Sequence, residues 1–270
     1  MLIEEVCKAT MRKITSKENT VVKEVVRLNK SAKERKEKKL FIAEGIRLCR
    51  DAVASGAQFE FLCFSQSFLE KHSDIYGEFP KNCEHFLLSD SLFSHICDTK
   101  SPQGVLGAVK MLDKTADFGT IKLSGRILAL ENLQDPVNIG TILRTAEALG
   151  IDCVLLTQDC CDVYSPKAVR GSMGAVFRQK IAFTSDLPLF IERFKNPKAT
   201  FAAVLSESAV ALDKVAFPKD CIVVVGNEGN GITAETVRSC FNNIIIPMSG
   251  KAESLNAAVA ASILMWEMVK

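Results

Sequence analysis

Three glycine- and asparagine-rich turns in the second half of the chain each follow a short apolar run. They lie within Ile127–Gly150, Cys221–Ile232 and Ile244–Trp266, and each leads into a helix-like stretch. Open α/β sheets bind ligands in loops at the carboxyl ends of their strands, so we expect the three turns to meet at one sheet edge. The turns carry few charges. The pattern therefore predicts one shared pocket for a small organic ligand.

The rest of the chain shows two blocks of alternating strand-like and helix-like runs. Its length of 270 residues is a soft prior for about two domains. Helix-like residues 2–15 and 19–37 precede short runs that end near Lys110, which predicts a small α/β domain over residues 1–112. We interpret the polar stretch 113–125 as a linker. An α/β domain with a parallel sheet is predicted over residues 126–270, with strands near 127–132, 153–157, 201–206, 221–226 and 243–247.

Basic residues are concentrated near the amino terminus. Residues 1–50 hold 14 Lys and Arg against 7 Asp and Glu, whereas the whole chain has a formal net charge of only +2. A basic segment of this kind favours a polyanionic partner. The alternative is a solvated helix laced with its own ion pairs, and the Lys30–Lys39 run is compatible with both.

Cysteine and histidine placement argues against disulfides and metal sites. The ten cysteines include no C-x-x-C pair, and most of them lie in apolar runs. His72, His85 and His95 show no paired ligand spacing. There is no signal-like amino terminus and no apolar run of ~20 residues. These features predict a cytoplasmic protein with reduced thiols, no membrane span and no bound metal.

The glycine loop Gly226–Gly231, GNEGNG, follows a predicted strand but does not match the common nucleotide-binding loops. Its glycine order is G-x-x-G-x-G, whereas the dinucleotide fingerprint is G-x-G-x-x-G. No Gly-Lys-Ser or Gly-Lys-Thr closes it, which excludes a P-loop. A plain turn that needs positive φ angles is the alternative interpretation.

The first turn places polar residues at a predicted helix start. Asn138 is expected to cap a helix through Thr141–Leu149, with Gly150 ending it in the left-handed conformation. Gly140 and Arg144 then fall on the first turn and a half of that helix. Capping, close packing and surface charge would explain these residues without any function.

The third turn leads into an apolar helix. Ser254 and Asn256 stand at its start, where free N–H groups suit a carboxylate or hydroxyl. The helix, Leu255–Val269, is too short to span a bilayer. We expect it to pack against the sheet or against another subunit, because Val259 and Trp266 add to an apolar surface that one sheet face cannot easily bury.

Taken together and in this order, the three turns resemble the motifs of the SpoU (TrmH) branch of the SPOUT RNA methyltransferases. The similarity rests on N-x-G-x-x-x-R at Asn138–Arg144, on the glycine loop, and on I-P-M-x-G-x-x-E-S-L-N at Ile246–Asn256. The stretch Tyr164–Arg178, YSPKAVRGSMGAVFR, resembles the family's segment between the first two motifs. The resemblance covers residues 126–270, and the amino-terminal half looks like the small RNA-binding α/β domain that many members carry.

The resemblance implies a trefoil-knotted, homodimeric methyltransferase domain that binds S-adenosylmethionine among the three loops. It places polar catalytic positions at Asn138, Arg144, Glu228, Ser254 and Asn256. Cofactor contacts, many of them through the main chain, fall on Gly226, Asn227, Gly231, Ile246, Met248 and Leu255, with Ser206 as a further contact. RNA contacts are expected from basic side chains, namely Arg12, Lys13, Lys33, Arg35, Lys36 and Arg170.

The implied reaction transfers the sulfonium methyl group to a ribose 2′-oxygen. No histidine lies beyond His95, so the commonest general base is missing from this half of the chain. Arginine stays protonated, so Arg144 is better suited to stabilise a developing alkoxide or to hold a phosphate. Glu228 could orient Arg144, accept a proton or simply cap its loop, and the identity of the base stays open.

The attached basic domain makes ribosomal RNA the expected substrate, and transfer RNA is the alternative. A non-catalytic RNA-binding protein is a further alternative from another class. Such a protein would be expected to lose Asn138, Arg144 or Asn256, and all three are present. A nicotinamide-dependent dehydrogenase would require the dinucleotide fingerprint, which is absent.

Overall fold

The chain divides into two compact units. The computed structural model describes residues 11–112, 124–206 and 208–270. The first unit comprises Met1–Leu112 together with Tyr164–Phe177, and the second comprises Asp113–Val163 together with Arg178–Lys270. The segment Tyr164–Phe177, which was expected in the second domain, falls in the first unit. Most of the expected linker, residues 113–123, lies outside the described residues.

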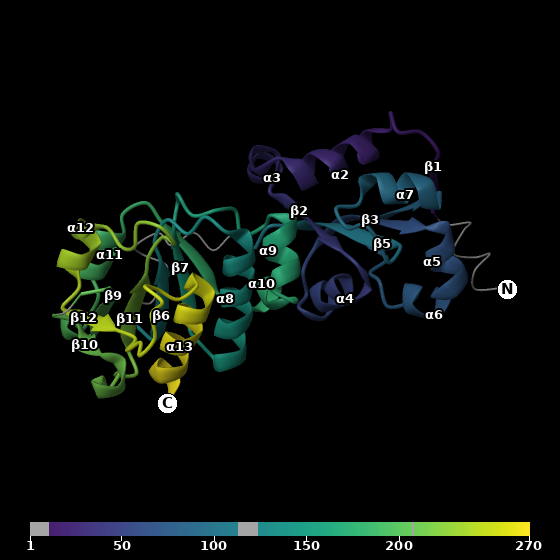
Figure 1. Ribbon diagram of the computed structural model, residues 1–270. Helices are drawn as coiled ribbons and strands as arrows, with labels where there is room; N and C mark the ends of the chain where they lie inside the picture. The colour runs from purple at the N-terminus through teal and green to yellow at the C-terminus, as the bar shows by residue number, and fades with distance from the viewer. Residues whose placement is uncertain (1–10, 113–123, 207) are drawn as a thin grey trace. The chain divides into compact units, whose positions relative to one another are not determined.

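The first unit is built on a five-stranded sheet with the order β1-β4-β3-β5-β2 (Figure 1). Its strands are β1 (Arg12–Ile14), β2 (Leu40–Glu44), β3 (Phe59–Ser65), β4 (Glu84–Leu88) and β5 (Val105–Lys110). Strands β1, β3 and β4 run parallel, and β5 is antiparallel to β2 and β3. Its helices are α2 (Thr20–Lys30), α3 (Ala32–Lys38), α4 (Ile46–Ala54), α5 (Gln66–Lys71), α6 (Ser73–Tyr76), α7 (Asp90–Ile96) and α9 (Pro166–Gly171).

Two expectations for the amino-terminal helices were wrong. Arg12–Ile14 is not helical but pairs with β4 as an edge strand, and residues 2–10 of that predicted helix lie outside the described residues. The predicted helix 19–37 is two helices. Ser31 ends α2 in an extended conformation, and its hydroxyl accepts from the Glu34 N–H to cap α3.

The second unit contains the predicted parallel sheet, with seven strands in the order β10-β12-β9-β11-β6-β7-β8. Its strands are β6 (Arg126–Leu130), β7 (Cys153–Thr157), β8 (Ile181–Thr184), β9 (Thr200–Ala203), β10 (Val210–Ala211), β11 (Cys221–Val225) and β12 (Asn242–Ile245). The short strands β8 and β10 were not predicted. All pairings in this sheet are parallel, so β6, β11 and β12 deliver the loops that follow them to the same edge.

Helices α8 (Pro136–Leu149) and α13 (Ala257–Val269) pack side by side against this sheet (Figure 1). Helix α8 ends at Gly150, which adopts the expected left-handed conformation with φ +69°. The remaining helices are α10 (Ala175–Arg178), which spans the junction of the units, α11 (Leu187–Glu192) and α12 (Ala234–Ser239), with one-turn 3-10 helices at Pro197–Ala199 and Leu212–Lys214. Among the described residues, no helix has the length and apolar character needed to cross a membrane.

Candidate active site

The loop after β6 is organised by Asp135 rather than by Asn138. The Asp135 carboxylate accepts from the Val137 N–H at 2.9 Å and caps α8, while Pro136 occupies the first helical position. The prediction that Asn138 caps this helix was therefore wrong. Asn138 lies inside the first turn and is buried, so its side-chain amide is available for contacts with other loops.

The glycine loop after β11 closes on itself. The backbone N–H and C=O groups of Asn227 and Gly231 bond to each other at 3.0 Å in both directions. The Asn227 side chain accepts from Gly229 and Asn230 and donates to the Asn132 carbonyl at 2.8 Å. A Cβ on Gly226 would lie 2.2 Å from the Gly231 backbone. Gly226 is thus required for close approach, and within the loop the positive φ belongs to Gly231.

A chain of three side chains links the three loops. The Asn138 amide nitrogen donates to the Glu228 carboxylate at 3.0 Å. The Asn138 amide oxygen accepts from the Asn256 amide nitrogen, also at 3.0 Å. Asn256 in turn caps α13 by accepting from the N–H groups of Ala258 and Val259. Three of the five predicted catalytic residues are therefore joined in one hydrogen-bonded network.

Glu228 is held as a carboxylate. Burial raises its pKa, but hydrogen bonds from Asn138 and from the backbone N–H groups of Gln134 and Asp135 outweigh burial and bring the pKa below its usual value. The group is therefore ionised at neutral pH and is a weak base. This favours a positioning role for Glu228 over the role of proton acceptor.

Glu131, which is not among the predicted site residues, fixes the end of the glycine loop. Its buried carboxylate accepts from the Thr233 N–H at 2.7 Å, from the Thr233 hydroxyl at 2.9 Å and from the Thr236 hydroxyl at 2.5 Å. These contacts anchor the start of α12 to the end of β6. A carboxylate placed directly after the apolar run ILAL was the available signal, because a buried charge requires such partners.

The ends of β9, β11 and β12 and the loop before α13 surround a pocket of about 570 Å³. Most of the predicted cofactor and catalytic positions line it, namely Gly226, Asn227, Glu228, Gly231, Ile246, Met248, Ser254, Leu255 and Asn256. The charged side chains among its described lining are Glu228 and Glu253, so the pocket has no lining cation there. Ser206 does not line it, although Val204 and Leu205 do.

Arg144 is exposed on α8 and does not line the pocket. It lies on one helical stripe with Val137 and Thr141, which are also exposed. Across the described residues Arg144 takes part in no ion pair, so its charge is available to a partner molecule.

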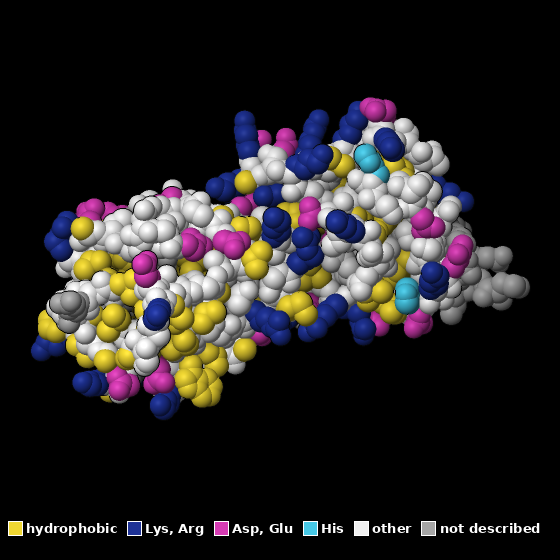
Figure 2. Space-filling view, in the orientation of Figure 1, with side chains coloured by type: hydrophobic (Ala, Val, Ile, Leu, Met, Phe, Trp, Pro, Cys, Tyr) yellow, Lys and Arg dark blue, Asp and Glu magenta, His cyan; other side chains and the backbone are white. Residues whose placement is uncertain are grey.

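The predicted RNA contacts differ in accessibility. Lys13 and Lys36 are exposed, and Figure 2 shows Lys and Arg side chains projecting over α2 and α3. Several others have protein partners: Arg12 pairs with Glu84 at 2.7 Å, Lys33 with Glu37 at 3.7 Å, and Arg170 with Asp98 at 2.7 Å.

Arg35 is buried, so it cannot serve as the expected RNA contact in this structure. Its guanidinium donates to the carbonyls of Leu28 and Asn29 at the end of α2. It thereby fixes the corner between α2 and α3. Two exposed cations in the last turns of α2, Arg27 and Lys30, were missing from the predicted set.

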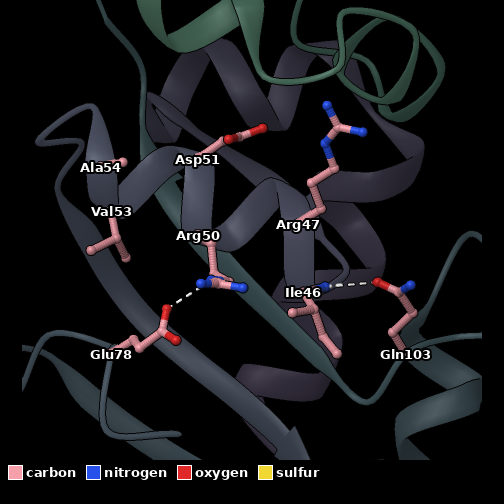
Figure 3. Close-up of a pocket in the computed structure, with 8 residues that line it drawn as sticks. All are labelled: Ile46, Arg47, Arg50, Asp51, Val53, Ala54, Glu78 and Gln103. Carbon is pink, nitrogen blue, oxygen red and sulfur yellow. Dashed lines mark hydrogen bonds and ion pairs between the residues drawn. The ribbon is translucent and has the colours of Figure 1, made fainter. Parts of the chain in front are cut away.

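A second pocket, of about 590 Å³, lies beside α4 in the first unit (Figure 3). Arg50 pairs with Glu78 across it at 2.7 Å, and Gln103 accepts from the Ile46 N–H at 2.8 Å. Arg47 and Asp51 complete its charged lining, which is balanced between two arginines and two acids. This balance gives no reason to expect an anionic ligand there.

The described cysteines and potential metal ligands are as follows. The nine cysteines that the structure describes are all free. Near the candidate site, burial raises the pKa of Cys161 to about 12, and the neighbouring Cys160, Asp135 and Glu228 act in the same direction. Residues 11–112, 124–206 and 208–270 contain no group of His, Cys, Asp and Glu suited to hold a metal ion.

Comparison with known proteins shows matches over most of the chain. Residues 125–266 match the SpoU rRNA Methylase family, and residues 19–107 match the MRM3-like substrate binding domain. An uncharacterized tRNA/rRNA methyltransferase of Synechocystis sp. is 32% identical over 255 residues, covering 94% of this chain and 92% of that protein. The 23S rRNA (guanosine(2553)-2′-O)-methyltransferase RlmP of Bacillus subtilis is 28% identical over 258 residues, covering 96% and 99%.

Solved structures are similar over nearly the whole chain. The AdoMet-bound rRNA methyltransferase of Sinorhizobium meliloti superposes with a TM-score of 0.83 at 28% identity, covering 96% of this chain and 97% of that one. The predicted family, the α/β fold with its parallel sheet and the smaller amino-terminal α/β domain are confirmed. The chain belongs to the SpoU rRNA methylase family.

Proposed function

We propose that this protein is an S-adenosylmethionine-dependent RNA methyltransferase that modifies a ribose 2′-hydroxyl of ribosomal RNA. The observation that carries the proposal is the Glu228–Asn138–Asn256 network, which joins three distant loops around one pocket. The name of the Bacillus subtilis relative specifies ribosomal RNA and 2′-O-methylation, and this supports both the substrate class and the target atom.

The pocket suits the proposed cofactor in charge and polarity. Its lining is largely aliphatic, with Ile244, Ile246 and Leu255 among the contributors, and its described charges are both acidic. Such a lining favours a cationic ligand and offers no side-chain cation to a pyrophosphate-containing nucleotide. The AdoMet-bound relative supports the same assignment. When bound, the cofactor supplies an electrophilic methyl group.

The surrounding residues would then position the acceptor hydroxyl. Arg144 supplies an exposed cation that can hold an RNA phosphate or stabilise negative charge developing on the 2′-oxygen. Asn138, Asn256 and Glu228 act through one another to keep the loops in register. Ser254 is exposed and lines the pocket, which supports a contact with a bound ligand.

We propose a homodimer formed through the exposed faces of α8 and α13. Val259 and Trp266 on α13 and Val137 on α8 are 49%, 57% and 50% exposed, which is unusual for large apolar side chains on packed helices. Figure 2 shows hydrophobic side chains gathered over α13. Arg144 shares the α8 stripe with Val137, so dimerisation would place this arginine beside the partner copy.

The first unit is proposed to select the RNA. The match to a substrate binding domain and the exposed cations of α2 and α3 support this role. The name of the Synechocystis relative includes transfer RNA, which keeps that substrate as the second candidate. The free thiols of the described cysteines are compatible with the reducing cytoplasm.

The test is methylation in vitro, with labelled S-adenosylmethionine and with ribosomal RNA fragments and transfer RNA as separate substrates. Digestion to nucleosides then locates the methyl group. The proposal expects label on ribose in ribosomal RNA. Label confined to transfer RNA would support the second candidate, and label on a base would contradict the ribose assignment.

A further inference from the structure

The segment Tyr164–Phe177 belongs to the methylase domain by sequence and to the first unit by structure. It lies within the stretch 125–266 that matches the methylase family, yet it packs with Met1–Leu112. Its two ends run directly into the second unit, at Val163 and Arg178. The segment therefore packs in the first unit while both of its ends continue, through the backbone, into the second unit.

Aromatic packing anchors the segment. The Tyr164 ring centroid lies 4.7 Å from that of Phe41, and the Phe177 centroid lies 5.8 Å from it. All three side chains are buried. Phe41 belongs to β2, which is the edge strand of the first sheet, and α9 packs on this strand. The segment thus adds buried aromatic side chains to the core around β2.

An ion pair and a hydrogen bond fix the position of α9 relative to β2. The Arg170 guanidinium pairs with Asp98 at 2.7 Å. The Asp98 N–H donates to the Glu44 carboxylate at 2.8 Å, at the end of β2. The Arg170 and Asp98 side chains are about one third exposed, so the pair adds little to stability. Its geometric effect is to hold α9 at one position along the strand.

The turn that follows α9 is shaped to fit α4. Met173 and Gly174 adopt positive φ angles of +49° and +86°. A Cβ on Gly174 would lie 2.3 Å from the Asp51 carboxylate, so only glycine allows this approach. In Figure 3, Asp51 points away from Glu78 and toward the neighbouring green ribbon. The segment is therefore held by three separate contacts. They are made with β2, with Asp98 after α7, and with α4.

We infer that Tyr164–Phe177 couples RNA engagement by the first unit to methyl transfer in the second. Arg170 is then a positioning residue, not an RNA contact, because its charge is committed to Asp98. If these contacts are lost, RNA should still bind to the first unit, but its acceptor hydroxyl should be misplaced for methyl transfer. The inference rests on the proposed function, since it takes the RNA to be held by the first unit.

The test compares Arg170→Ala and Asp98→Ala with wild type in the full-length protein. Both variants are expected to lower kcat by roughly ten- to hundredfold through misplacement of the acceptor. The Kd for RNA, its salt dependence and the Kd for S-adenosylmethionine should stay unchanged. Because the two residues form one pair, the double variant should lose no more than either single variant.

Arg178→Ala is the matched control. Arg178 pairs with Glu147 at 2.8 Å with side chains 38% and 34% exposed, against 34% and 37% for Arg170 and Asp98. Loss of this pair within the second unit should leave kcat unchanged. The inference is overturned if Arg170→Ala weakens RNA binding and lowers its salt dependence while Asp98→Ala does neither, since that pattern identifies an RNA contact.

A structural readout separates this inference from the proposed function. Failure of the wild type to methylate any RNA would refute the proposed function alone. Gly174→Ala should still speed amide hydrogen exchange in β2 relative to wild type, because the added Cβ displaces the segment from α4. Unchanged exchange in β2 would show that the segment does not hold this strand, and the coupling would be wrong.

Discussion

Asn138 and Glu228 are 90 residues apart in the sequence and are joined by a hydrogen bond of 3.0 Å. The bond connects the first turn of α8 to the glycine loop, and the other end of the same amide holds Asn256 at the start of α13. One buried amide thus sets the relative positions of three loops. A side chain that has both a donor and an acceptor is required for this, which explains an asparagine inside a helix.

Asn138→Ala should destabilise the protein and slow methyl transfer together. The substitution leaves the Asn256 donor and part of the Glu228 carboxylate without their partner, and such a loss costs about 1–3 kcal/mol of unfolding free energy. Chemical denaturation and steady-state kinetics measure the two effects. Asn230→Ala is the control, because Asn230 is an exposed residue of the glycine loop whose side chain takes no part in the network. Unaltered stability and turnover in Asn138→Ala would contradict the role of the network.

Arg144→Ala should abolish most methyl transfer while leaving the Kd for S-adenosylmethionine within a few-fold. Arg144 lies outside the pocket lining, and loss of one preorganised donor costs about 2.7–4 kcal/mol of transition-state stabilisation. Arg238→Ala, which removes an exposed arginine from α12, should have little effect. Near-normal turnover in Arg144→Ala would refute the assignment.

Light scattering should return a mass near 59 kDa, twice the 29.6 kDa of one chain. Trp266→Asp places a charge in the apolar face of α13 and should shift the mass toward the monomer. Phe241→Asp is the matched control, since Phe241 is 64% exposed but lies outside α8 and α13. A wild-type monomer at micromolar concentration would exclude the proposed dimer.

Stability should fall as the pH drops below about 6.5, the usual pKa of histidine. Burial lowers the pKa of His85, and the nearby Lys81 acts in the same direction, against a hydrogen bond to the Pro80 carbonyl. The Pro80 carbonyl can only accept, so Nε2 donates to it and Nδ1 accepts from the Tyr76 hydroxyl at 2.8 Å. Protonation turns Nδ1 into a donor, so the Tyr76 hydroxyl can no longer donate to it, and the charged ring is buried. Because the folded-state pKa is depressed, this stability is complete above pH 6.5 and is lost as the pH falls.

Denaturation midpoints measured between pH 5 and 7.5 test this dependence. His85→Gln lacks the titrating group, so its pH dependence in this range should be shallower than that of the wild type. His95→Gln removes an exposed histidine and serves as control. An identical slope in wild type and His85→Gln would show that another group is responsible.

Much of the fold was readable because short apolar runs alternate with polar turns and helix-like stretches. The runs at Ile127, Cys153 and Cys221 became strands β6, β7 and β11. The misses have local causes. Strand β1 carries Arg12 and Lys13, which gives no apolar signal, and β10 has only two residues. The break at Ser31 was missed because one serine both ends a helix and begins the next.

In the candidate site, too, local sequence patterns predicted which residues are present, but not the contacts between distant segments. Motif positions identified the residues of the pocket, but the cap at Asp135 and the partners of Asn138 depend on contacts between loops. Arg35 looked like a surface cation within a basic run, and only its neighbours Leu28 and Asn29 reveal a structural role. The docking of Tyr164–Phe177 on the first unit has no local signature, because periodicity does not show which core an apolar face joins. The trefoil knot follows from family resemblance and stays a prediction.

Calorimetric titration of the purified protein with S-adenosylmethionine tests the central claim most directly, because it asks whether the three loops form one cofactor pocket. The acidic and aliphatic lining predicts saturable binding of S-adenosylmethionine, with no added metal, and no binding of NAD. The absence of heat with S-adenosylmethionine together with tight binding of NAD would contradict the account.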